Sequence, residues 1–301
     1  MRSVKTIAPV LVALAVMGFL FSRLEAGDLL GALHRGDKTL LLLGLVPLCL
    51  AHVFSIWRWK SLVGAYGVNS RFGEMTKIYF ANLSVAKWSP MYSGDFLRAV
   101  YLKEKLPQTE GAAIILLESI IDVFVLLLFV LGSALWSREL PYVGIAGTGI
   151  LFLFGVIYLV STPMLVSFSR ISAYAVRISA VFQFFRRAPG AVFLTFLITV
   201  LSWLQISIFI KIMFLAFGYP EVSFFYVLTA QPLVTLFSLL PVTLGGLGTR
   251  EGAMLFFYTA FVAAPVVFLI SLLYSTMSLI VFPFLGLLIG FSEIKKLFHA
   301  H

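Results

Sequence analysis

The chain has 301 residues, of which 61% are hydrophobic and 12% charged, and its formal net charge is +9. Soluble domains carry roughly 45–50% apolar and about 25% charged residues, so this composition excludes a soluble protein and predicts an integral membrane protein. The excess positive charge lies in short segments between apolar runs, which indicates membrane orientation and not nucleic-acid binding. The single cysteine, Cys49, lies in an apolar run, and the four histidines lack metal-ligand spacing. We therefore expect no disulfide, no metal site and no cofactor.

Apolar runs long enough to cross a bilayer recur along the whole chain. A helix needs about 20 apolar residues to cross about 30 Å of hydrocarbon. The runs are residues 6–22, 39–57, 111–136, 140–169, 188–210 and the part of 252–292 that follows Pro265. The second run ends in Trp57-Arg58-Trp59-Lys60, a combination of aromatic residues and cations that is typical of an interfacial anchor. We predict an all-α polytopic membrane protein with about six spanning helices and two re-entrant broken helices.

Residues 222–252 form an apolar segment with a glycine-rich break. Pro241 cannot continue a helix without losing a backbone hydrogen bond, and the adjacent charges Arg250 and Glu251 follow the break. Backbone freed from a helix in lipid must be satisfied by protein or by water in a cavity, and charges at that depth are a functional-site hypothesis. The segment predicts a broken helix that lines a polar cavity; the alternative is an ordinary extramembrane loop. The glycines that permit the break are Gly245, Gly246 and Gly248.

The pattern of this break recurs in the first half of the chain. Pro90 and Pro241 are 151 residues apart, and each is followed four residues on by a glycine, Gly94 or Gly245, with an acid and an arginine close behind. Each half then holds three spans and one broken segment, so we expect the halves to have opposite orientations in the membrane. Interrupted segments at matching places in two inverted halves indicate the binding site of a transporter.

The charges of the connecting segments predict the orientation of the chain. Residues 58–77 carry +3 and residues 170–187 carry +4, whereas residues 23–38 balance to zero. Positively charged segments stay in the cytoplasm. With six spans and two segments that enter and leave on one side, this rule places both termini in the cytoplasm. We predict a single transmembrane domain over residues 1–301, built from inverted halves of roughly 1–137 and 138–301.

Two arginines beside the breaks are candidate ligands for a lipid phosphate. Arg98 and Arg250 each follow a break, and a guanidinium binds a phosphate through two parallel hydrogen bonds. Backbone N–H groups of glycine-rich loops offer further donors to the same anion. The alternative is that Arg98 pairs with Asp95, and Arg250 with Glu251, only to hold the fold.

Two acids lie four positions apart in the predicted span 111–136, on one face of the helix. They are Glu118 and Asp122. Two acids on one face in lipid do not both stay ionised without partners. A proton relay, a counter-charge to the arginines and structural ion pairs between helices all remain open as roles.

Three motifs together resemble those of a known family. They are Pro241…Gly245-Gly246-Leu247-Gly248-Thr249-Arg250-Glu251-Gly252, Gly94-Asp95-Phe96-Leu97-Arg98-Ala99 and Glu118…Asp122. They are similar to the motifs of the lysylphosphatidylglycerol synthase transmembrane region, also called the flippase-like domain family, and the resemblance covers essentially the whole chain. One departure is Ser119, where many members carry an arginine, so a charge partner inside that span is missing. The resemblance implies a stand-alone member without a fused transferase domain, in the cytoplasmic membrane of a prokaryote.

The resemblance implies movement of a lipid across the bilayer without naming the lipid. We predict a flippase-like transporter of a phosphate-bearing phospholipid or glycolipid, with membrane lipid and no nucleic acid as its partner. The sequence contains no convincing nucleophile–base constellation, so we expect no enzyme. The alternatives are a membrane-embedded enzyme of lipid synthesis and a non-catalytic partner of a cell-envelope glycolipid enzyme. The candidate substrate-binding residues are Arg250, Glu251, Gly245, Gly246, Gly248, Arg98, Asp95, Gly94, Glu118 and Asp122.

Overall fold

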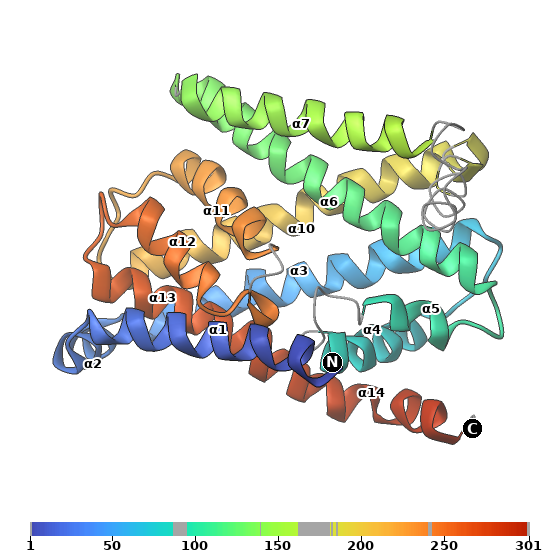
Figure 1. The fold of residues 1–301 in the computed structure, drawn as a ribbon, viewed down its shortest axis with the longest axis horizontal. Helices are drawn as coiled ribbons and strands as arrows, with labels where there is room; N and C mark the ends of the chain where they lie inside the picture. Colours follow the sequence, from blue (N-terminus) through green and yellow to red (C-terminus); the bar gives the residue numbers. More distant parts are fainter. Residues whose placement is uncertain are drawn as a thin grey trace.

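The structure, a computed structural model, describes residues 2–86, 95–138, 140–161, 181, 183–184, 186–239 and 243–299. All regular secondary structure in these ranges is helical, which confirms the all-α prediction (Figure 1). The elements of the first half are α1 (Arg2–Ser22), α2 (Ala26–Arg35), α3 (Lys38–Ala65), α4 (Phe72–Ala86), α5 (Leu97–Tyr101), α6 (Gln108–Ser137) and α7 (Leu140–Ser161). Those of the second half are α10 (Pro189–Ala216), α11 (Phe224–Ser238), η2 (Leu244–Gly246), α12 (Thr249–Tyr258), α13 (Ala264–Thr276), the π-helical turn η3 (Met277–Val281) and α14 (Phe282–His299).

Several described helices are long and apolar enough to cross a membrane. Four qualify alone: Lys38–Ala65, Gln108–Ser137, Pro189–Ala216 and Ala264–Lys295. A fifth is added if the pair Pro9–Ser22 and Gly27–Arg35, bent by 85°, is counted as one broken span. Leu140–Phe154 and Phe224–Ser238 are shorter apolar helices. The protein is therefore a multi-pass membrane protein. Residues 162–180, which include most of the basic segment 170–187, lie outside the described ranges, and the count of six spans stays a prediction.

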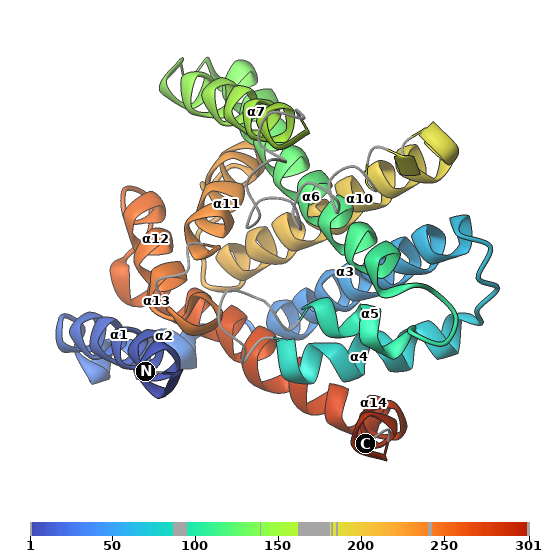
Figure 2. The ribbon, with the colours of Figure 1, turned by 45° about the vertical axis from the view of Figure 1, so that its right-hand side comes forward.

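The centre of the molecule is an antiparallel pair formed by α3 and α10, which lie side by side in both views (Figures 1 and 2). The backbone N–H of Asp37, at the start of α3, donates to the carbonyl of Ala216, at the end of α10, over 2.8 Å. Farther along, the Ser202 hydroxyl donates to the Ala51 carbonyl over 3.2 Å. The two helices thus run in opposite directions over most of their length, and they join the two halves of the chain.

The helix bounds follow the same spacing as the two breaks. Both ends of α10 are displaced from those of α3 by 151 residues, the separation of Pro90 from Pro241. The short helices α4 and α11 and the helix starts after the breaks, α5 and α12, correspond within one residue of this offset. This correspondence agrees with a repeat of helix order. The inversion of the halves relative to the membrane remains a prediction.

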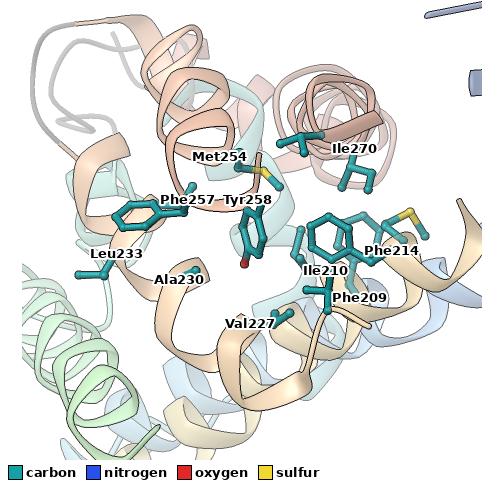
Figure 3. Packing of buried hydrophobic residues seen from close by; sticks show 14 of the residues in the cluster. Phe209, Ile210, Phe214, Val227, Ala230, Leu233, Met254, Phe257, Tyr258 and Ile270 are labelled. Carbon is teal, nitrogen blue, oxygen red and sulfur yellow. The ribbon is translucent and has the colours of Figure 1, made fainter. Parts of the chain in front are cut away.

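An apolar cluster between α10, α11, α12 and α13 fixes the helix that follows the second break. In Figure 3, Met254 and Tyr258 of α12 lie next to Phe214 of α10 and Ile270 of α13. The rings of Phe214 and Tyr258 are 4.8 Å apart. All four side chains are buried, and burial of a large apolar side chain stabilises the fold by about 1.5–3 kcal/mol. The later turns of α12 are therefore packed against α10 and α13, which positions its first turn.

Glycines let α14 pack closely against α4 (Figure 2). A Cβ atom at Gly286 would lie 2.3 Å from the carbonyl oxygen of Phe80, and one at Gly290 would lie 2.5 Å from the Cα atom of Ala81. Small residues four apart permit such approach between membrane helices. This contact sets the position of α4, which carries Tyr79 toward the interior.

Candidate functional site

The second break stops one helix and starts another by means of its glycines. Gly245, Gly246 and Gly248 have φ angles of 60°, 78° and 87°, in the left-handed region that favours glycine. The Glu251 carboxylate accepts a hydrogen bond from the N–H of Gly248 over 2.5 Å and so caps the new helix α12. Arg250 therefore lies in the first turn of α12. Pro241, at the start of the break, lies outside the described ranges.

Arg250 and Glu251 are joined through a hydroxyl and not by a direct ion pair. Arg250 Nη1 donates to Ser275 Oγ over 3.0 Å, and the Ser275 hydroxyl donates to Glu251 Oε1. Arg250 Nη2 lies 3.4 Å from the Gly245 carbonyl oxygen, and the guanidinium lies 4.9 Å from the ring centre of Tyr274. No described carboxylate lies within ion-pair distance of this guanidinium. Its buried charge is therefore compensated only by neutral groups within the described part of the chain.

Arg58 is the partner of the two acids on α6. Its Nε donates to Glu118 Oε1 over 3.1 Å, and its two terminal nitrogens donate to the two Asp122 oxygens over 2.7 and 3.1 Å. Nη1 also donates to Thr199 Oγ1 on α10 over 3.0 Å. Trp203 Nε1 adds a bond of 2.9 Å to Asp122. Among the three roles left open by the sequence, this geometry corresponds to ion pairs between helices.

Arg98 approaches the same acids from α5. Its Nη1 lies 2.8 Å from Glu118 Oε2, a close ion pair whose atoms are not aligned as a hydrogen bond. Its guanidinium lies 4.7 Å from the ring centre of Trp59. Asp95 instead accepts a bond of 3.1 Å from the side-chain amide of Asn82. Arg98 is thus paired with Glu118, and the alternative ion pair with Asp95 is not formed.

Arg58, Trp59 and Ser275 are site residues that the sequence interpretation missed. The assignment of Arg58 and Trp59 to an interfacial anchor is wrong, because their exposed fractions are only 8% and 0%. The charge partner that the sequence lacks at Ser119 is supplied by Arg58 of α3 and Arg98 of α5, which both pair with Glu118. The local sequence gives no signal for this, because the apolar run ends at Trp57 whereas α3 continues to Ala65.

A cavity of about 360 Å³ lies between these charged groups. We call it the Arg250 chamber. It is lined by Asp95, Ser119, Asp122, Val123, Leu126, Trp203, Thr235, Ser238, Leu239, Arg250, Tyr274 and Ser278. A second cavity of about 180 Å³, the His52 chamber, shares Asp122, Trp203, Tyr274 and Ser278 with it. The two chambers therefore adjoin along one wall.

The predicted site residues fall into three groups. Arg250, Asp95 and Asp122 line the Arg250 chamber. Arg98, Glu118 and Glu251 are buried behind it and hold lining residues or their neighbours in place. Gly245, Gly246 and Gly248 form the backbone of the break, and Gly94 lies outside the described residues. Within the described ranges, no group of three or more His, Cys, Asp or Glu side chains is arranged to hold a metal ion.

The fold and the site define a polytopic helical membrane protein with a chamber whose lining includes charged groups. Residues 6–286 match the model of the family described as the lysylphosphatidylglycerol synthase TM region. The chain belongs to this family. Comparison with curated proteins found no match. Membership ties the protein to the metabolism or transport of membrane lipids.

Proposed function

We propose that the protein is a lipid transporter that moves a phosphate-bearing lipid between the leaflets of the cytoplasmic membrane. One observation carries the proposal: Arg250 faces the chamber without a carboxylate partner among the described residues, whereas Arg58 and Arg98 are both paired with acids. A buried cation in a membrane costs a few kcal/mol. A phosphate with two oxygens toward the guanidinium would offset that cost through paired, charge-assisted hydrogen bonds.

Transport fits the chamber better than catalysis. A lipid-modifying enzyme needs a nucleophile within hydrogen-bond reach of a base. The Ser119 and Ser238 hydroxyls in the chamber instead donate to the backbone carbonyls of Ile115 and Val234 in their own helices. The Ser278 hydroxyl, which also lines the chamber, has no base within hydrogen-bond reach among the described residues. Asp122, the acid of α6 that lines the chamber, is held by Arg58 through two hydrogen bonds. We therefore propose membrane lipid as the ligand and no chemical step.

The orientation of the transporter is part of the proposal. The positive segments 58–77 and 170–187 favour cytoplasmic termini, with the two breaks entering from opposite faces. Cysteines introduced at positions 2 and 299 should react with an impermeant maleimide only in inside-out vesicles. Labelling of either position from outside intact cells would overturn this orientation.

The decisive experiment measures binding and movement of phosphatidic acid, which has a phosphate and no further head group. Purified protein would be examined by native mass spectrometry for retained lipid, and in proteoliposomes for movement of a fluorescent phospholipid between leaflets. Arg250→Ala should weaken retention about 10- to 100-fold, since a hydrogen bond to a charged group contributes about 1.5–3 kcal/mol. Arg250→Lys keeps the charge but loses the paired geometry, so its retention of phosphatidic acid should lie between that of the parent protein and that of Arg250→Ala.

Two controls separate loss of the ligand from loss of the fold. Arg71→Ala removes an exposed arginine at the start of α4 and should leave retention and movement unchanged. Diacylglycerol, which lacks the phosphate, should be retained equally by the parent protein and Arg250→Ala. If Arg250→Ala retains phosphatidic acid and moves lipid like the parent protein, the phosphate role of Arg250 is wrong.

A further inference from the structure

We propose that the His52 chamber is a second head-group subsite, which takes a neutral, hydroxyl-bearing group such as a polyol or a sugar attached to the lipid phosphate. This inference rests on the proposed function, because it assumes a phosphate at Arg250. It goes beyond that function by naming the chemistry of the group on the far side of the phosphate.

The two chambers lie against each other, as a ligand that occupies both would require. Asp122, Trp203, Tyr274 and Ser278 line each of them. The His52 chamber has a volume of about 180 Å³, far more than the roughly 10–15 Å³ that one water molecule requires. In this proposal, a head group anchored by its phosphate at Arg250 passes the shared residues, Tyr274 among them, to enter the second chamber.

The charges around the His52 chamber compensate each other. Its two ionised lining groups, Arg58 and Asp122, hold each other through two hydrogen bonds. Glu118 behind them is shared between Arg58 and Arg98. A second phosphate would find Arg58, and an ammonium group would find Asp122, already held in this ion pair. An uncharged group has no such conflict.

The remaining polar groups of the chamber suit hydroxyls. The Ser55 and Ser202 hydroxyls both donate to the Ala51 carbonyl, over 2.9 and 3.2 Å, and their oxygens can still accept from a ligand. Ser278 lies between the chambers, and its hydroxyl has no hydrogen-bond partner among the described residues. Donors and acceptors on several helices thus face one small space.

Aromatic side chains hold the far wall in place. His52 Nδ1 and the Tyr79 hydroxyl are 2.9 Å apart, and the imidazole lies 4.1 Å from the ring of Phe282, measured between centroids. Apolar and aromatic walls with a few placed polar groups are typical of sites for small molecules.

The test compares phospholipids that differ only in the group attached to the phosphate. Phosphatidic acid, phosphatidylglycerol, phosphatidylinositol and phosphatidylethanolamine with identical acyl chains would compete for the purified protein, with retention measured by native mass spectrometry. We expect phosphatidylglycerol or phosphatidylinositol to be retained about tenfold or more over phosphatidic acid, the result of a few added hydrogen bonds. The double variant Ser55→Ala with Ser202→Ala should reduce this preference to about threefold or less, and leave retention of phosphatidic acid unchanged.

Two further variants keep the result interpretable. Ser278→Ala acts on the same subsite from a different helix and should reduce the same preference. Ser61→Ala is the matched control: its hydroxyl donates to a carbonyl one turn back on α3, as that of Ser55 does, but it lies outside both chambers. The control should behave like the parent protein.

The outcomes separate this inference from the proposed function. Equal retention of all phosphate-bearing lipids would overturn the subsite and leave the role of Arg250 intact. Preference for phosphatidylethanolamine would also overturn it, in favour of an ammonium site. Retention of none of the four lipids would overturn the proposed function itself, and with it the subsite.

Discussion

Replacement of Arg58 by leucine should destabilise the protein more than most single substitutions. Arg58 has an exposed fraction of 8%, and its guanidinium donates hydrogen bonds to Glu118, Asp122 and Thr199. Arg58→Leu leaves Asp122 with only the bond from Trp203 among the described residues and Glu118 with only Arg98. Removing one partner of a buried ion pair costs about 3–5 kcal/mol, because the other charge stays buried without compensation. We expect a loss of free energy of unfolding in that range.

The assay is reversible unfolding in mixed micelles, followed by tryptophan fluorescence. Arg58→Lys should give a smaller loss, because it keeps the charge but cannot bond both acids in the same geometry. Lys105→Leu provides the comparison, since the pair of Lys105 with Glu74 is exposed and should contribute only about 0–1 kcal/mol. If Arg58→Leu is no more destabilising than Lys105→Leu, the cluster does not hold the helices together as argued.

Two more substitutions test the packing and the support of the site. Ser275→Ala should weaken retention of phosphatidic acid about tenfold, because Arg250 loses the hydroxyl that orients it. Ser271→Ala is the control and should leave retention unchanged, because the buried Ser271 hydroxyl donates to the Phe268 carbonyl and not to Arg250. Equal effects of the two changes would refute an orienting role of Ser275. Gly290→Ala should lower the free energy of unfolding by about 1–3 kcal/mol, because the new methyl group meets the Ala81 backbone. Gly132→Ala is the control: its added Cβ has no neighbour within 4 Å, so it should be neutral or slightly stabilising. Both variants would be compared by chemical denaturation, and equal stability of the two would contradict the close contact of α4 with α14.

The helical class and the main spans could be predicted because they depend on local composition. The ends of the helices could not. The apolar run 39–57 stops where the charges begin, but α3 continues to Ala65 and carries Arg58 into the interior. Hydropathy assigns a cost to each charge in isolation. A folded bundle offsets that cost with partners from other helices, and no local window contains them.

Distance along the chain also limited the prediction of the site. The shared helix face of Glu118 and Asp122 follows from their spacing, and the depth of Arg250 follows from the apolar sequence around it. Their partners do not follow: Arg58 is 60 residues from Glu118, and Ser275 is 25 residues from Arg250. Only the packing of α3 against α6, and of α12 against α13, brings these atoms together. The sequence could therefore name the charges but not decide which of them are paired.

Pairing divides the three arginines that are buried among the described residues into two roles. Arg58 and Arg98 contact acids and tie helices together, whereas Arg250 is held by the Ser275 hydroxyl and a backbone carbonyl. A charge swap of Arg250 with Glu251 would therefore not preserve a local ion pair, because none exists between them; it would remove the carboxylate that caps α12 at Gly248. Loss of activity in that swap would report a damaged helix start. The single change Arg250→Ala leaves the bonds of Glu251 to the Gly248 N–H and to Ser275 in place, and it isolates the one buried cation whose charge the described protein leaves available to a ligand.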